Sequence, residues 1–225
     1  MPSTRIPPGY NPDYNHPIGV DERLWSALLV GAFLGSLAWG ASGSSLFTLS
    51  AMTALAALYI DSLSYGMHNI LDNYRFASFP PLRRIATEFQ VHHVRPGDVV
   101  KRGYLRNNTY ELCFYVGLPL ALPALFFERG TALNIFFLAS GVWTSFIPTV
   151  HAWAHQPRHP NRLVAALQKS GLILSPGRHS RHHRGLESEF RAYSLLNGWT
   201  NSFLDLFFAG ARDQKTLDQR SADYR

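Results

Sequence analysis

An uncharged run of 37 residues, from Leu24 to Ile60, constrains the fold of this chain more than any other feature. The hydrocarbon core of a bilayer is about 30 Å thick and is crossed by roughly 20 apolar residues in a helix, so the run is long enough for two spans. The segment Gly40-Ala41-Ser42-Gly43-Ser44-Ser45 interrupts it with turn-forming residues. We therefore expect a transmembrane hairpin with limbs Leu24–Gly40 and Leu46 to about Asp72.

A second pair of apolar segments follows in the other half of the chain. The segments run from Leu112 to Phe127 and from Thr131 to about His155, and only three residues separate them. Proline removes a helical hydrogen bond, so we expect kinks at Pro119, Pro123 and Pro148. The predicted fold is an all-α integral membrane protein with four transmembrane helices in two hairpins and a cytoplasmic helical cap that carries the histidine motifs.

The segments outside the spans are polar. Residues 1–23 contain five prolines and lack a signal-peptide pattern, so we expect a flexible N-terminal arm. Residues 24–211 form the predicted membrane domain, and residues 212–225 a frayed tail. Within the domain we expect a helix on the membrane surface from Pro80-Pro81 to His92-His93, and an amphipathic run near Leu163 to Leu174.

The charges predict the orientation in the membrane. Of 21 lysines and arginines, two precede the first span, seven lie between the second and third, and eleven follow the fourth, which leaves Arg129 alone. By the positive-inside rule both termini and the central loop are cytoplasmic. The basic residues form no continuous face, which argues against a nucleic-acid-binding protein despite the net charge of +6. The single cysteine excludes an internal disulfide framework.

Histidines are concentrated in four motifs. If the stretch Gly177 to His183 is helical, its H-x-x-H-H spacing places three imidazoles on one face. The predicted topology brings this stretch to the same side of the membrane as three further motifs. Imidazole and carboxylate suit iron, zinc or copper, and nine ligands exceed what one ion takes, so we expect two metal ions. The candidate ligands are His68, Asp72, His92, His93, His151, His155, His179, His182 and His183.

Each motif also has a simpler interpretation. A lone H-x-x-x-H at a helix end is weak evidence for metal ligands. Arginines alternate with the histidines of the H-x-x-H-H stretch, as they would in a basic patch that binds lipid phosphates. A membrane b-type cytochrome also pairs histidines, but its ligands lie inside the spans and number two per haem. A non-catalytic metal- or lipid-binding membrane scaffold would keep the histidines without needing O2 or a reductant. The convergence of all four motifs favours one metal site.

The order of the motifs resembles the plasmanylethanolamine desaturase family, a branch of the histidine-box lipid desaturases. The similarity runs from about Asp61 to Asn201. It comprises H-x-x-x-D at His68, the pair His92-His93 followed by Pro96 and Asn108, then H-x-x-x-H, then H-x-x-H-H with a downstream Asn197-Gly198-Trp199. The resemblance implies an enzyme, a diiron oxidoreductase that uses O2 and an external electron donor such as cytochrome b5 or ferredoxin. No catalytic residue is expected beyond the metal ligands.

The residues suit such chemistry in their own right. Imidazoles bind iron and leave positions open for O2. Side chains that accept the outer imidazole N–H groups should orient the ligands, and the candidates are Asp61, Glu88 and Asn108. Arginines beside the last motif would bind a phosphate head group, and the candidates are Arg178, Arg181 and Arg184.

The resemblance also implies the substrate, a 1-O-alkyl (plasmanyl) phospholipid that is converted to its vinyl ether, a plasmalogen. Two enzymatic alternatives stay open, an acyl-lipid desaturase of the phosphatidylglycerol type and a histidine-box hydroxylase. Plant acyl-lipid members carry a plastid transit peptide, and the arm here does not look like one. The expected partners are a phospholipid and an electron-transfer protein. The expected location is the inner membrane of a bacterium or the endoplasmic reticulum of a eukaryote.

Overall fold

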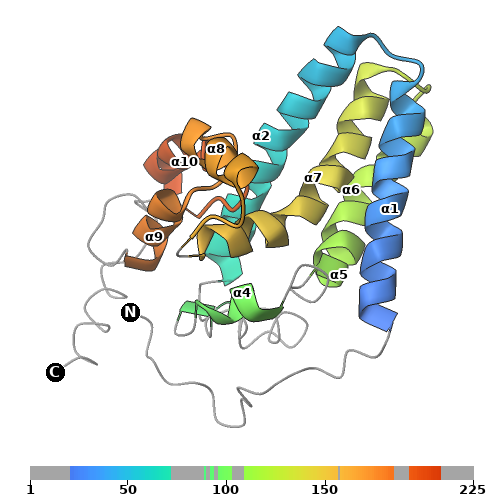
Figure 1. The fold of residues 1–225 in the computed structure, drawn as a ribbon. Coiled ribbons are helices and arrows are strands. Elements are labelled where there is room, and N and C mark those ends of the chain that lie inside the picture. Colours follow the sequence, from blue (N-terminus) through green and yellow to red (C-terminus); the bar gives the residue numbers. More distant parts are fainter. Residues whose placement is uncertain are drawn as a thin grey trace, which may run out of the picture. The chain divides into compact units, whose positions relative to one another are not determined.

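A computed structural model of the chain describes residues 21–71, 89, 92–93, 96–102, 109–156, 158–184 and 193–208. Every regular element among these residues is a helix (Figure 1). The predicted arm and tail fall almost entirely outside them, and so does most of the predicted surface helix, although Phe89, His92 and His93 are helical. The chain forms two compact units, one of residues 15–61 and 102–152 and one of residues 1–14, 62–101 and 153–225.

Among the described residues, four helical segments are long and apolar enough to cross a membrane, as the sequence predicts. They are α1 (Asp21–Ala41), α2 (Leu46–Leu71), the third span (Thr109–Phe126) and α7 (Ala132–Ala154). The pairing of these spans into two hairpins below a cytoplasmic cap stays a prediction.

The turn between α1 and α2 is closed by serine side chains. Ser42 Oγ donates to the carbonyl of Trp39 at 2.8 Å, and Ser44 Oγ donates to that of Ala41 at 3.0 Å. Ser45 begins α2 by accepting the backbone N–H of Thr48 at 3.0 Å. Helix ends leave backbone groups without helical partners, and short hydroxyl side chains satisfy them. The interruption in the uncharged run is therefore a helix end followed directly by a helix start.

The third span changes helix type along its length. It begins as α5 (Thr109–Leu112), widens to the π-helix η3 (Cys113–Gly117), returns to α6 (Leu118–Ala121) and tightens to the 3-10 helix η4 (Leu122–Phe126). The changes accompany Pro119 and Pro123, which cannot donate a backbone hydrogen bond and clash with the preceding turn. Pro148, by contrast, lies inside a helix that continues from Ala132 to Ala154.

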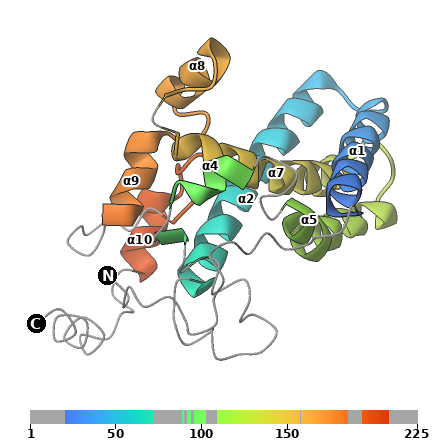
Figure 2. The ribbon, with the colours of Figure 1, turned by 60° about the horizontal axis from the view of Figure 1, so that its bottom comes forward.

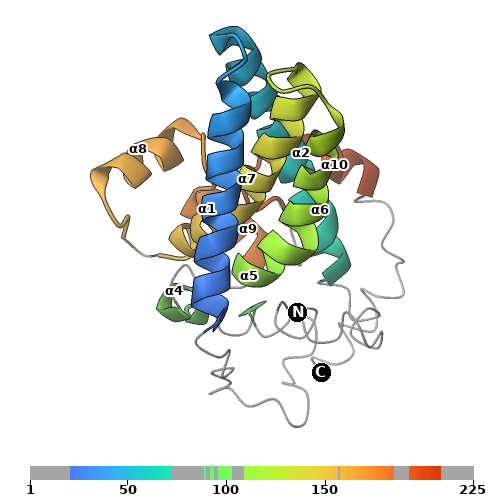
Figure 3. The same cartoon turned by 90° about the vertical axis from the view of Figure 1, so that its right-hand side faces the viewer.

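Close helix contacts in the unit of residues 15–61 and 102–152 depend on small residues. α1 lies beside the third span in two views (Figures 1 and 3), where Phe33 is 5% exposed. A Cβ atom added at Gly117 would lie 3.0 Å from the ring of Phe33, and one added at Gly40 would lie 2.7 Å from Leu138 Cδ1 on α7. Glycine thus allows these helices to approach each other, as is common in membrane bundles.

The other unit holds the short helices, α4 (Asp98–Arg102), α8 (Arg162–Ser170), α9 (Pro176–Arg184) and α10 (Asn201–Phe208). Within it α9 and α10 are neighbours (Figure 2). The amphipathic run predicted near Leu163 to Leu174 is α8, which ends at Gly171 in the left-handed conformation. The H-x-x-H-H stretch, whose helicity was a condition of the sequence-based prediction, is helical and forms most of α9.

Candidate metal centre

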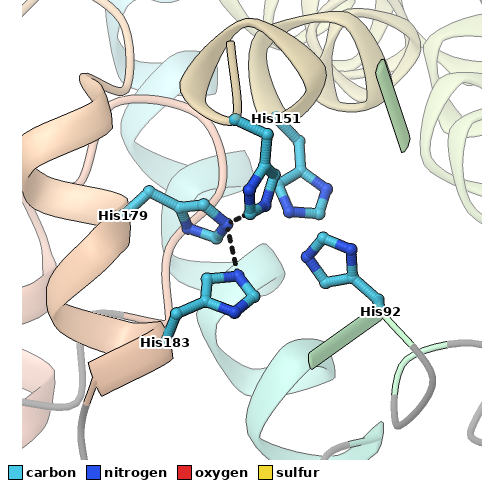
Figure 4. A group of neighbouring side chains, drawn as sticks. His92, His151, His179 and His183 are labelled. Carbon is cyan, nitrogen blue, oxygen red and sulfur yellow. Dashed lines mark hydrogen bonds between the residues drawn. The ribbon is translucent and has the colours of Figure 1, made fainter. Parts of the chain in front are cut away.

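Eight histidines converge in two groups whose ring nitrogens are close enough to share a metal ion. Within each group, one potential ligand atom per residue lies within 4.8 Å of all the others. Figure 4 shows four members of the first group with their rings turned toward a common space. The first group is His92, His151, His155, His179 and His183, and the second is His68, His93 and His182.

Helix α9 supplies ligands to both groups. His179 and His183 are four residues apart and share one stripe of the helix, whereas His182 is rotated to the neighbouring stripe. The helix starts at Pro176, and Ser175 accepts the backbone N–H of Arg178 on its Oγ at 3.3 Å. Proline at the first helical position and serine just before it are strong helix-start signals. The local sequence therefore fixes the helix on which three of the eight histidines lie.

The imidazole nitrogens face one another at short distances. His179 Nε2 lies 2.7 Å from His155 Nε2 and 3.1 Å from His183 Nε2. In the second group His182 Nε2 lies 3.2 Å from His93 Nε2. The groups adjoin each other, since the ring centroids of His93 and His183 are 4.7 Å apart. When several ring nitrogens point at one place, their lone pairs repel one another. A bound cation removes this repulsion, because each lone pair then coordinates the cation.

The environment of the first group favours the neutral form of two of its imidazoles, His155 and His183. Burial, with smaller contributions from the neighbouring His93 and His182, lowers the pKa of His155 to about 4. Burial also lowers the pKa of His183, with smaller contributions from the surrounding imidazoles. The neutral imidazole has the lone pair that binds a metal. The donor set of buried, neutral imidazoles therefore fits iron, copper or zinc.

A backbone carbonyl orients His68 in the second group. His68 is fully buried on α2, and its Nδ1 lies 2.9 Å from the carbonyl oxygen of Tyr193. A carbonyl only accepts hydrogen bonds, so Nδ1 carries the hydrogen and the lone pair is on Nε2. The ring of Tyr193 also packs at 4.8 Å from that of His182. Tyr193 could not be identified from the sequence, because any residue type can supply a backbone carbonyl acceptor.

Residues 193–199 form hydrogen bonds to α2, which carries His68, to α9, and to Leu174 shortly before α9. The backbone N–H of Leu195 donates to Ser64 Oγ on α2 at 3.0 Å. The carbonyl of Leu196 accepts the N–H of Leu174, just before α9, at 2.8 Å. The carbonyl of Asn197 accepts Nη1 of Arg178 on α9 at 2.8 Å. This connecting segment (residues 193–199) thus holds α2 and α9 together. It contains the Asn197-Gly198-Trp199 sequence, and this structural role could not be inferred from the motif alone.

The remaining predicted site residues have varied positions. Asp61 is fully buried on α2, and its role as an orienting acceptor stays a prediction. Arg178 donates to the protein's own backbone, and Arg181 is exposed. His159, which was not among the candidate ligands, lies outside both groups, and its Nδ1 is 2.5 Å from Gln168 Oε1. Four further predictions fall outside the described residues, namely Asp72, Glu88, Asn108 and the side chain of Arg184.

Comparison with known proteins identifies a family. Residues 58–209 match the model of the lipid desaturase domain. The chain is 29% identical over 189 residues to fatty acid desaturase 4, chloroplastic, of Arabidopsis thaliana. The aligned region covers 82% of this chain and 57% of that protein. It is 27% identical over 173 residues to plasmanylethanolamine desaturase of Myxococcus xanthus, with 75% and 60% covered.

The chain therefore spans about 60% of the length of these relatives. No solved structure matches it significantly. The domain match contains all eight grouped histidines and the whole of α7 to α10, and it covers well over half of the chain. With four apolar helices and two adjoining histidine groups, the chain belongs to the lipid desaturase family.

Proposed function

We propose that this chain is a membrane diiron desaturase that introduces a double bond next to the glycerol-linked end of a phospholipid chain. The observation that carries the proposal is the pair of adjoining imidazole groups in a chain of the lipid desaturase family. Two adjoining groups suit two metal ions, and we favour iron over copper, which also supports O2 chemistry with imidazole ligands, because the chain belongs to the lipid desaturase family. Zinc binds similar ligands but has no redox chemistry.

The first group would hold one iron through its five imidazoles. The second would hold the other through His68, His93 and His182, with Asp72 as a further ligand. The irons, when bound, supply the oxidising power that removes two hydrogens from the lipid, while O2 accepts these with two electrons and two protons from outside and leaves as two water molecules. Burial favours the neutral form of His155 and His183, and the carbonyl of Tyr193 fixes the ring of His68.

The substrate we favour is a 1-O-alkyl phospholipid, which becomes a vinyl ether. The similarity to plasmanylethanolamine desaturase supports this choice. Arg181 is exposed on α9 and, with Arg184, is suited to bind a phosphate head group. Arg178 is the weakest of the three candidates, because its guanidinium already donates to Asn197. An acyl-lipid desaturase is the second candidate, favoured by the similarity to a chloroplastic fatty acid desaturase.

The electron donor would be a separate small redox protein such as cytochrome b5 or ferredoxin. We further propose that both termini and the histidine groups face the cytoplasm, as the distribution of basic residues indicates. This placement gives a soluble donor direct access to the metal centre.

Lipid analysis tests the reaction. A host supplied with alkylglycerol should form acid-labile vinyl-ether lipids when it expresses the wild-type chain and none with His183→Ala. His159→Ala is the matched control, since it removes an imidazole outside both groups and should leave the product unchanged. Double bonds confined to ester-linked chains would replace the ether-lipid proposal with the acyl-lipid one.

Metal analysis tests the centre independently of the substrate. Purified wild-type protein should contain about two irons per chain, as expected from two ligand groups, and His183→Ala should contain less. The His159→Ala control should retain the wild-type amount. A fully active protein that contains zinc and no iron would refute the diiron proposal, because zinc cannot change oxidation state.

A further inference from the structure

The helix α10 (Asn201–Phe208) has its polar side inward and its apolar side outward. Asn201 and Asp205 are buried, at 7% and 3% exposure, whereas Phe203, Leu206 and Phe207 are 63%, 77% and 65% exposed. A helix on the surface of a water-soluble domain has the opposite pattern, with its apolar stripe toward the core. The outer face of α10 is therefore unsuited to water. We define this apolar face as Phe203, Leu206 and Phe207.

The inward polar residues make specific hydrogen bonds, so the orientation of α10 is well determined. Asp205 Oδ1 accepts the hydroxyl hydrogen of Tyr65 at 2.6 Å, and Asn201 Oδ1 accepts the backbone N–H of Ser194 at 2.9 Å. A rotation of α10 that buried its apolar face would break both hydrogen bonds and separate the carboxylate of Asp205 from the hydroxyl of Tyr65. The two phenylalanine rings meanwhile pack on each other, with centroids 4.9 Å apart.

The bond to Tyr65 gives the depth of α10 relative to a bilayer. Tyr65 is on α2, which is 26 residues long and begins at Leu46. At about 1.5 Å per residue, the twenty residues from Leu46 to Tyr65 span about 30 Å, the thickness of the hydrocarbon core. Tyr65 therefore lies near one boundary of the hydrocarbon, and the apolar face of α10, held at that residue, is at the same level.

The tryptophan just before α10 also agrees with an interfacial position of this helix. Trp199 precedes α10, is 49% exposed and donates its indole N–H to the carbonyl of Gly171 at 2.7 Å. Tryptophan with a satisfied polar end and an exposed apolar ring is typical of the membrane interface.

We propose that the apolar face of α10 inserts into the lipid leaflet at the boundary reached by Tyr65, as an interfacial helix and not as a span. The occupant of this face is phospholipid acyl chain. The inference does not depend on the reaction that the protein catalyses. It places the connecting segment, whose Tyr193 touches His68 and His182, directly at the lipid surface.

Site-directed fluorescence tests the proposal on the full chain in lipid nanodiscs. The native thiol is removed by Cys113→Ser, and a single cysteine is introduced by Leu206→Cys or, in a second variant, by Phe203→Cys. Each is labelled with an environment-sensitive dye. Spin labels on the lipid acyl chains quench dyes in the membrane, and iodide quenches dyes in water. The control is Lys169→Cys on α8, an exposed charged position. Circular dichroism checks that each variant keeps the wild-type helix content.

We expect the dyes on α10 to be quenched by lipid labels at least about twofold more than the dye at residue 169, and most strongly by labels at shallow acyl positions. Iodide should give the reverse order. Quenching of the α10 dyes by iodide would overturn the proposal by placing the face in water. Protection from both quenchers would overturn it in favour of a protein partner or second copy, and strongest quenching by deep labels would overturn the interfacial depth.

Discussion

The substitution Gly198→Ala should destabilise the connecting segment that joins α2 and α9. Gly198 has a φ of 76°, in the left-handed region, where an L-residue costs about 1–2 kcal/mol. A Cβ atom there would also lie 3.0 Å from Asn201 Nδ2, so the Asn201 side chain must shift. That side chain accepts the N–H of Ser194, a hydrogen bond worth about 1 kcal/mol. We therefore expect a loss of about 1–3 kcal/mol in the free energy of unfolding.

Thermal unfolding of purified protein in detergent measures this loss. For a chain of 150–250 residues, 1 kcal/mol corresponds to about 2–4 °C, so Gly198→Ala should lower the Tm by roughly 2–12 °C. The matched control is Gly177→Ala, which adds the same methyl group in helix α9. No atom lies within 4 Å of a Cβ at Gly177, and alanine favours the helix more than glycine does. The control should therefore melt at or above the wild-type temperature.

The comparison of the two variants decides the result. Equal Tm values for Gly198→Ala and wild type would refute the reasoning, because the left-handed backbone would then be of no consequence. A similar decrease in both variants would assign the loss to crowding around α9 instead of to the backbone conformation at Gly198.

Two further predictions concern a buried hydrogen bond and the topology. Tyr65→Phe removes the hydroxyl that donates to buried Asp205, and should cost about 1–3 kcal/mol in thermal unfolding, whereas Tyr59→Phe, at a 41% exposed position, should be silent. An unchanged Tm for Tyr65→Phe would show that the bond contributes nothing. A reporter fused after Gly130 should behave as exoplasmic and one fused after Arg225 as cytoplasmic, from the positive-inside rule. The opposite result would reverse the proposed orientation of the metal centre.

The membrane spans could be predicted closely from the sequence. The first was expected at Leu24–Gly40 and lies within α1, which ends at Ala41; the second was expected to begin at Leu46, as α2 does. The thickness of the hydrocarbon core sets the length of such helices, so the length of an uncharged run predicts the length of the span directly. The changes of helix type in the third span were expected only as kinks, because proline indicates where a helix is perturbed but not whether a π or 3-10 turn absorbs the perturbation.

The histidine spacing predicted which residues gather but not how they divide. Adjacent His92 and His93 fall in different groups, as do His182 and His183, because neighbours on a helix diverge by about 100°. Arg178 was expected to bind a phosphate head group, but its guanidinium donates a hydrogen bond to the carbonyl of Asn197. The acceptor is a backbone carbonyl 19 residues away, and such a contact cannot be predicted from residue types.

The sequence by itself determined the class of fold and the residues of the candidate centre, since hydrophobic length and helical spacing are local properties that each segment carries alone. The tertiary structure alone decided how the centre is held. His68 meets the carbonyl of Tyr193 across 125 residues, Ser64 meets Leu195 across 131, and Tyr65 meets Asp205 across 140. Such contacts exist only once the helices have packed, because they join backbone and side-chain groups whose positions depend on every element between them.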